Sequence, residues 1–156
     1  MKKNKTLILL LLVCASLFIL TSCGSKTAIT SDDFKTKMEA DGYTIVDATD
    51  QFSGYEYINN VYLAVDKDKT YQIEFYDIST EEYADGVFQN NKSIFEDSKG
   101  STSAESSTSV NNYETYSLSS NDTYKYISRV DNTMLYVDVS SEYKDTVKEV
   151  IDKLGY

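Results

Sequence analysis

Three stretches of the chain repeat apolar residues at the three- and four-residue spacing of an amphipathic helix. They begin near residues 30, 79 and 140, each with hydroxyl residues followed by acids. Such hydroxyls cap free backbone N–H groups, and the acids meet the positive end of the helix dipole. Ser79 with Glu82 fits the capping box. The last stretch is the most regular, with Tyr143, Val147, Val150, Ile151 and Leu154 on one face. We therefore predict three helices, each with one apolar side.

Between these helices the apolar period changes to two, which is typical of strands. One alternating run covers 61–65 and another covers 71–76, and the polar turn 66–69 joins them as a predicted hairpin. Shorter or similar runs predict further strands at 43–48, 113–118, 124–130 and 134–139. Asn and Asp residues at 119–122 and 131–132 favour turns between the last three strands.

These elements predict an α+β domain in which an antiparallel sheet carries three helices packed on one face. The order αβββ, αβββ, α also raises the hypothesis of a duplicated αβββ unit, over 30–78 and 79–139, followed by a C-terminal helix. The segment 96–112 contains a Ser/Thr-rich run with no apolar residues to bury. We predict that it is a mobile loop.

The beginning of the chain has a different pattern. Three lysines among the first five residues precede an apolar run over 7–20, and the run ends in Leu20-Thr21-Ser22-Cys23. A basic start, an apolar centre and small residues at a cleavage site are typical of a secretory signal peptide. The alternative is a retained transmembrane helix, but the run is short for a segment that needs about 20 apolar residues.

Leu20-Thr21-Ser22-Cys23 resembles the lipobox of bacterial lipoproteins, and the chain is similar in this respect to small uncharacterised surface lipoproteins of Gram-positive bacteria. The resemblance implies that residues 1–22 are a signal peptide and that Cys23 carries acyl chains such as palmitate. Residues 23–29 would form a tether, and 30–156 a single domain held at the outer face of the cell membrane. Two or more acyl chains are needed for stable anchoring.

Charge and composition limit the partners, metal sites and catalytic mechanisms that we expect for this chain. The chain has 15 basic and 25 acidic residues, and loss of the signal with its three lysines would leave a net charge of −13. Nucleic acid, which attracts clusters of Lys and Arg, is therefore not an expected partner. The chain has no His, and its two cysteines are Cys14 and Cys23, which argues against the usual zinc sites and against Ser-His-Asp catalysis. We predict no cofactor and no metal.

The tyrosines are the strongest binding candidates. All 14 lie beyond Cys23. If the aliphatic positions face the helices, the opposite sheet face forms a candidate binding face of Tyr62, Gln72, Glu74, Tyr76, Tyr116 and Tyr136. Tyrosine offers rigid contact area with a polar tip, although packing within the sheet explains the same pattern. If Tyr124 and Tyr126 are core, then Lys125 and Arg129 join this face.

The sequence thus predicts a membrane-anchored domain that binds a protein or a small molecule without catalysis. Two alternatives stay open. A small hydrolase would use two carboxylates across a deep pocket. An accessory subunit of a membrane complex would show an apolar surface patch of about several hundred Å².

Overall fold

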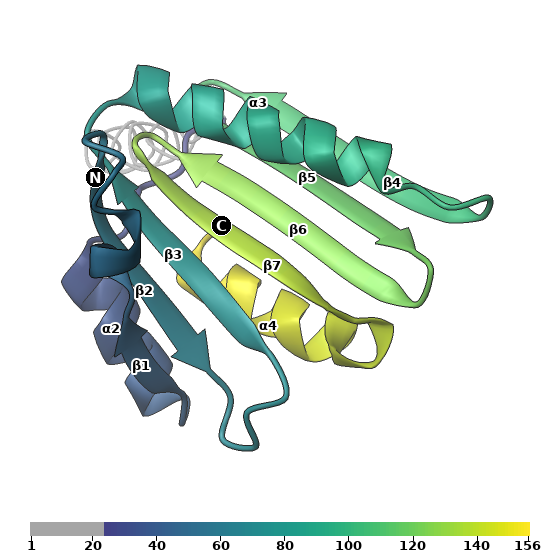
Figure 1. Cartoon of the computed structure of the whole chain (residues 1–156), viewed down its shortest axis with the longest axis horizontal. Helices are drawn as coiled ribbons and strands as arrows, with labels where there is room; N and C mark the ends of the chain where they lie inside the picture. Colours follow the sequence, from purple (N-terminus) through teal and green to yellow (C-terminus); the bar gives the residue numbers. More distant parts are fainter. Residues whose placement is uncertain (1–23) are drawn as a thin grey trace, which may run out of the picture.

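The computed structural model describes residues 24–156, so the predicted signal peptide and Cys23 lie outside the described residues. Figure 1 shows a twisted sheet with helices in front of it and behind it. In chain order the elements are α2 (Ser31–Ala40), β1 (Thr44–Asp47), η2 (Thr49–Phe52, a 3₁₀ turn), β2 (Ile58–Val65), β3 (Gln72–Ile78), α3 (Glu81–Asp97), β4 (Ser103–Val110), β5 (Tyr113–Ser120), β6 (Thr123–Val130), β7 (Thr133–Ser140), η3 (Ser141–Tyr143) and α4 (Lys144–Leu154). Within this part of the chain, none of the helices is both long enough and apolar enough to cross a bilayer.

The sheet has seven antiparallel strands in the order β1-β2-β3-β7-β6-β5-β4. The pairing of β3 with β7, from Glu74↔Tyr136 to Asp77↔Thr133, joins the early strands to the late ones. The predicted turn between β5 and β6 is confirmed, with Asn121 and Asp122 both at positive φ. That conformation matches the twist of a two-residue hairpin.

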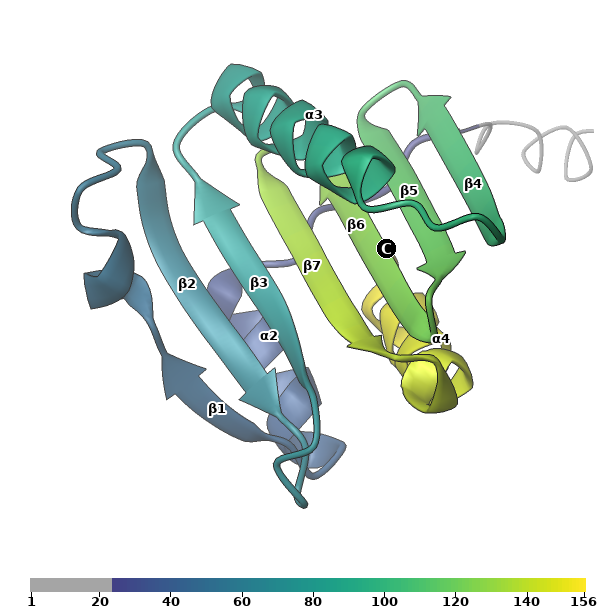
Figure 2. The same ribbon diagram turned by 45° about the vertical axis from the view of Figure 1, so that its right-hand side comes forward.

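The helices cover both faces of the sheet. Figure 2 shows α3 on one side and α2 with α4 on the other. Successive side chains of a strand point to opposite faces, and the neighbours Tyr126 and Ile127 belong to separate buried clusters, one with Ile151 of α4 and one with Phe88 of α3. The α+β class is confirmed, but the prediction of three helices on one face is wrong for α3, because both faces of the sheet are apolar.

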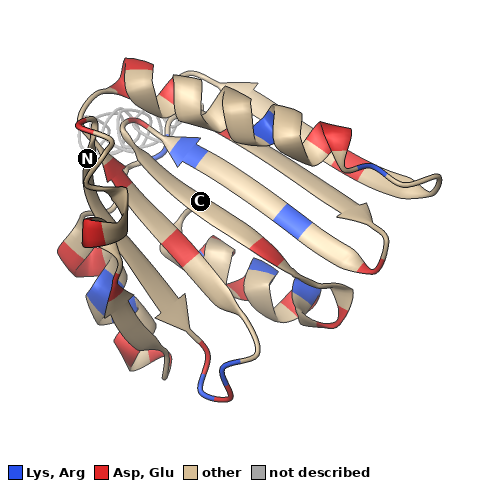
Figure 3. Cartoon of the chain, viewed as in Figure 1, with Lys and Arg blue, Asp and Glu red and all other residues tan. Residues whose placement is uncertain are grey.

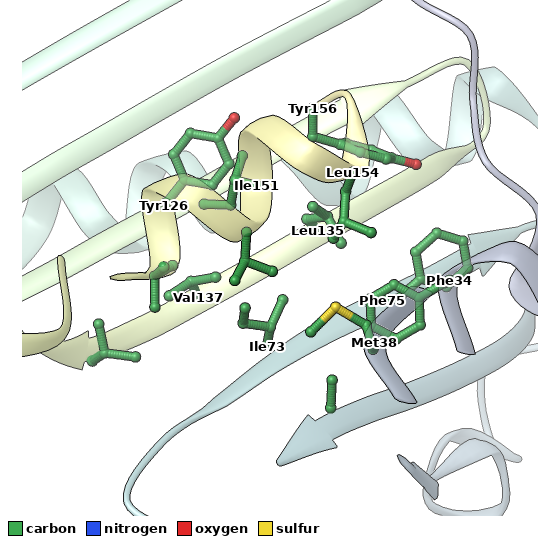
Figure 4. Close-up of a cluster of buried hydrophobic side chains, with 14 of the residues drawn as sticks. Phe34, Met38, Ile73, Phe75, Tyr126, Leu135, Val137, Ile151, Leu154 and Tyr156 are labelled. Carbon is green, nitrogen blue, oxygen red and sulfur yellow. The ribbon is translucent and has the colours of Figure 1, made fainter. Parts of the chain in front are cut away.

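The larger core lies between the sheet and α2 with α4 (Figure 4). Phe34 and Phe75 stack at its centre with ring centroids 4.8 Å apart and an interplanar angle of 17°, and both are fully buried. Ile151 and Leu154 of α4 are each 3% exposed. Full burial of one such side chain stabilises the fold by about 1.5–3 kcal/mol, so this cluster fixes both helices on the sheet.

The Ser/Thr-rich segment is a strand, not the loop that we predicted. β4 pairs with β5 along its whole length, from Ser103↔Ser120 to Val110↔Tyr113. Backbone pairing needs no buried side chains, so a polar run can form an edge strand once β5 offers a free edge. Glu105 of β4 also accepts a hydrogen bond of 2.8 Å from the Tyr116 hydroxyl.

The two predicted halves of the chain differ in the number of strands and in the placement of their helices. The first has three strands and the second has four. The opening helix of the first half, α2, also packs on the opposite face of the sheet from α3, which opens the second. The duplication hypothesis is therefore not confirmed.

The helix starts and the tether also differ in detail from expectation. Thr30 forms the predicted kind of capping box, with Asp33, whereas α3 is capped by Thr80 and not by Ser79.

The segment that we expected to be a free tether is bound to the domain. The backbone N–H and C=O of Lys26 bond the Asn112 side chain at 3.1 and 2.7 Å, and residues 28–29 pack against the core.

Candidate ligand-binding cleft

A cleft of about 520 Å³ opens on the α3 side of the sheet. Its lining residues lie on the side of the sheet that α3 covers, which is the near side in Figure 1. We call it the aromatic cleft. Its lining residues come from the end of η2 and the loop after it, from three strands and from α3: Phe52, Tyr55, Tyr57, Ile58, Glu74, Tyr76, Val87, Asn90, Asn91, Met134 and Tyr136.

Strand pairing builds the floor of the cleft. Along β3, Glu74 and Tyr76 point towards α3, while the buried Phe75 between them joins the core on the other face. The register sets Glu74 beside Tyr136 and Tyr76 beside Met134. Directly paired residues share a face of the sheet, so the polar and aromatic side chains of the two strands lie side by side on the floor of the cleft.

The loop that walls the cleft is held by specific hydrogen bonds. The Thr49 hydroxyl accepts from the backbone N–H of Val61 at 3.0 Å, which fixes the start of the loop against β2. Further on, Tyr55 N–H donates to Phe52 C=O at 2.8 Å, and Ser79 N–H donates to Tyr57 C=O at 2.9 Å. The aromatic side chains of this loop therefore stand on a fixed backbone.

Five rings follow one another from the floor of the cleft to the start of α3. Phe52 meets Tyr76 edge-on at 5.6 Å and contacts Tyr55 at 6.3 Å. Tyr55 lies 5.8 Å from Tyr57, which stacks on Tyr83 at 5.1 Å. Tyr55 and Tyr83 are each 53% exposed, so the outer end of this row is open to solvent.

Glu74 is the charged group of the cleft. Its Oε1 accepts from Gln72 Nε2 at 2.8 Å, and its Oε2 accepts from the Tyr76 hydroxyl at 2.5 Å. Burial, reinforced by the Glu74 charge, raises the pKa of Tyr76 far above its usual range. Burial, with Asp138 and Glu74 nearby, raises the pKa of Tyr136 to about 12. Both tyrosines therefore remain neutral beside a carboxylate that acts as an acceptor.

The structure brings together four of the six residues of the predicted binding face. Gln72, Glu74, Tyr76 and Tyr136 all lie on the α3 side of β3 and β7. Tyr116 lies on this side too but is 2% exposed in the α3 cluster, so it is core.

Tyr62 is on the opposite face. It pairs with Phe75 and therefore shares its side of the sheet, and the Lys35 ammonium lies 4.7 Å from its ring centroid. The prediction placed Tyr62 wrongly because it assumed that Val61, Leu63 and Val65 faced the same helices as Phe75. The open question on β6 is also answered: Tyr124 and Tyr126 are core, and Lys125 and Arg129 lie on the α3 side.

Phe52, Tyr55 and Tyr57 were not predicted as site residues. The available signal was three aromatic residues within six positions, separated by Ser, Gly and Glu in a segment without strand or helix periodicity. Exposed aromatic residues on a loop are typical of binding surfaces. An analysis of helix and strand periodicity does not identify them, because they lie outside the periodic segments.

A second depression, of about 560 Å³, lies on the other face and includes Asp32 and Asp77. Both oxygens of Asp77 already accept from the amides of Asn59 and Asn60, at 3.1 and 3.2 Å. A hydrogen bond from Lys35 lowers the pKa of Asp32, the reverse of what a general acid requires. Within residues 24–156, no group of three or more acidic, His or Cys side chains could hold a metal ion.

Comparisons with known proteins add little. No protein-family profile matches the chain, and no curated protein matches it. A crystal structure from Thermotoga maritima, described as a GTP binding regulator, is similar over 78% of this chain and 84% of that chain, with 16% sequence identity and a TM-score of 0.46. This likeness is too distant to bear on function.

Proposed function

We propose that this chain is an exported lipoprotein, anchored by Cys23 at the outer face of the cell membrane, whose domain binds a ligand in the aromatic cleft without catalysing a reaction. The cleft carries the binding part of the proposal. Its volume of about 520 Å³ is within the usual range of about 300–1,000 Å³ for small-molecule sites. Aromatic walls with few polar groups are also typical of such sites.

The sequence motif supports the anchor, and the docked segment 24–29 supports a short connection to it. Gly24, at φ +98°, lies so close to the β4–β5 turn that a Cβ would come within 2.9 Å of Val110 Cγ1. Lys26, which is bonded to Asn112, follows Cys23 by three positions, so the chain between the lipidated residue and this fixed point spans about 11 Å at most. The anchored domain would therefore sit close to the membrane.

The cleft gives no support to the alternative of a carboxylate-dependent hydrolase. Among the described residues that line it, Glu74 is the only acid, whereas glycosidase-type chemistry needs two carboxyl groups across the substrate. A binding role requires only what the cleft offers, which is aromatic contact area and a fixed acceptor.

Metabolic labelling with a fatty acid tests the anchor. Cells that express the chain should incorporate the label, and Cys23→Ala should abolish it. Cys14→Ala is the matched control, since Cys14 lies within the segment to be removed, and it should retain the label. Persistent label in Cys23→Ala would contradict the assignment of the lipid to Cys23.

A ligand screen tests the cleft. The full-length chain in a non-ionic detergent would be exposed to a library of neutral, anionic and cationic small molecules and followed by the NMR signals of labelled tyrosine rings. We expect hits to shift Tyr55 and Tyr136. Hits that shift only Tyr62, on the opposite face, would move the binding site to the other depression.

A further inference from the structure

The aromatic cleft contains a charge that the protein itself does not neutralise. Glu74 is half-buried, and it is the only charged residue among the described residues that line the cleft. Within residues 24–156, no ion pair includes it. Its two hydrogen-bond donors, the Gln72 amide and the Tyr76 hydroxyl, are neutral. A half-buried carboxylate attracts a cation most strongly where water is partly excluded.

In the part of the chain that the structure describes, no basic side chain on this face lines the cleft, and Lys92 of α3 lies 5.6 Å from the centroid of the Tyr116 ring. The face seen in Figure 3 has basic positions on β6, and both are matched by acids: Lys125 pairs with Asp138, and Arg129 lies 4.0 Å from Glu114. Lys69 lines a neighbouring depression of about 300 Å³, which Glu74 and Tyr136 also line, but among the described residues no ion pair joins Lys69 to Glu74. Within the cleft itself, the positive charge would have to come from a ligand.

The aromatic rings supply the second half of a cation site. Phe52 and Tyr76 stand edge to face, 5.6 Å apart, and Tyr136 lies beside Glu74 in the sheet register. The faces of aromatic rings attract cations, and quaternary ammonium groups are recognised by several rings together. Rings and carboxylate converge here from a loop and two strands.

We propose that the aromatic cleft binds a small organic cation of the alkylammonium class, held among the rings of Phe52, Tyr76 and Tyr136 that line the cleft and beside the carboxylate of Glu74. This inference rests on the proposed binding function and specifies its ligand. Contact with the rings provides the affinity for the alkyl groups, and Glu74 discriminates in favour of positive charge.

Isothermal titration of the full-length chain in a non-ionic detergent tests the charge requirement with two probes of the same shape. Choline carries the quaternary ammonium group, and 3,3-dimethylbutan-1-ol replaces its nitrogen by carbon. We expect choline to bind about tenfold tighter or more, equivalent to about 1.4 kcal/mol. Equal affinities, or a preference for the neutral alcohol, would overturn the inference.

Two variants locate the effect. Glu74→Gln should weaken choline binding about tenfold and leave the alcohol unchanged. Phe52→Leu keeps apolar bulk at the end of η2 but removes the aromatic ring, and it should weaken the binding of choline more than that of the alcohol. Glu105→Gln is the matched control: it removes the same charge from another tyrosine-bonded carboxylate, one that lies outside the cleft, and it should bind choline like the unmodified chain.

The failure of this inference and that of the proposed function give different results. A neutral or anionic compound that binds more tightly than any alkylammonium ion, and loses affinity in Phe52→Leu, would overturn the cation assignment and retain the binding cleft. A screen in which no compound shifts Tyr55 or Tyr136 would overturn both. Choline binding unaffected by either variant would place the cation elsewhere and overturn the inference.

Discussion

At the scale of single residues, the tyrosines of this domain occupy core positions, hydrogen-bonded positions and exposed positions. Tyr126 fills the core against α4, Tyr76 donates to a carboxylate, and Tyr55 is half exposed at the mouth of the cleft. The C-terminal residue Tyr156 is 4% exposed, and its hydroxyl bonds the hydroxyl of Thr133. A ring with a polar tip suits all these positions, so residue type alone does not separate core from site.

The buried tyrosines predict how stability depends on pH. Burial raises the pKa of Tyr126 to about 12, above the usual value of about 10 for an unfolded chain. Between these values the folded state binds more protons than the unfolded state, so the free energy of unfolding falls as the pH rises. The stabilisation is complete below about pH 10 and is lost as the pH rises towards about 12.

Denaturant titrations at pH 8, 10 and 11.5 would check this dependence. The midpoint should fall at the alkaline end, and Tyr126→Phe should reduce that fall, since one titrating group has been removed. Tyr55→Phe, at an exposed position, is the control and should behave like the unmodified chain. An alkaline midpoint that is insensitive to Tyr126→Phe would contradict the argument.

At the scale of elements, α4 is secured by a continuous apolar stripe. Val147, Val150, Ile151 and Leu154 are all buried, and Gly155 ends the helix at φ +90°. We expect Ile151→Ala to lower the free energy of unfolding by about 2–5 kcal/mol, as truncation leaves a cavity in the core. Lys148→Ala, on the exposed side of the same helix, should change it little. A urea midpoint unaltered in Ile151→Ala would mean that α4 is peripheral.

The edge strand β4 leads to a different expectation from that for a free loop. Deletion of residues 103–109 would expose the backbone of β5 as a new sheet edge and remove the bond from Tyr116 to Glu105. Exposed edges promote pairing between molecules. We therefore expect a lower urea midpoint and concentration-dependent association in sedimentation experiments. A stable monomer with the original midpoint would show that β4 contributes nothing to the fold.

At the scale of the whole molecule, the segment after Cys23 ties the chain's start to the β4–β5 turn. Its anchor point is the side chain of Asn112, which bonds both backbone groups of Lys26 and also the carboxylate of Asp131. The Lys26 ammonium adds a contact 4.9 Å from the centroid of the Tyr113 ring. These contacts set the direction in which an anchored domain would face the membrane.

Hydrogen exchange can test this connection. Asn112→Ala should speed exchange of the backbone amides at residues 26–29, because it removes both bonds to Lys26. Lys26→Ala is the control, since it retains those backbone bonds and loses only the contact with Tyr113, and its exchange should change less. Equal protection in Asn112→Ala and the unmodified chain would show that the segment is held by other contacts.

The sequence alone determined most of the local structure. The spacing of apolar residues predicted all three helices and six of the seven strands, because helical and extended backbones impose different periods. It also grouped Gln72, Glu74 and Tyr76 on one face of β3 and left Tyr136 on the same side of β7. Four of the six predicted face residues therefore come together, since alternation within a strand is a local property.

Only the tertiary structure decided which face of each strand lies on which side of the sheet and which helix covers it. Tyr62 lies on the far face because the register of β2 with β3 pairs it with Phe75, and α3 covers Tyr116 because both faces of the sheet are apolar. β4 formed from a polar run because β5 offered it a free edge. Periodicity within a segment carries no information about register, strand order or crossover side, which depend on contacts between distant segments. For the same reason, Phe52 at the end of η2 and the loop residues Tyr55 and Tyr57 became part of the cleft only in the folded chain.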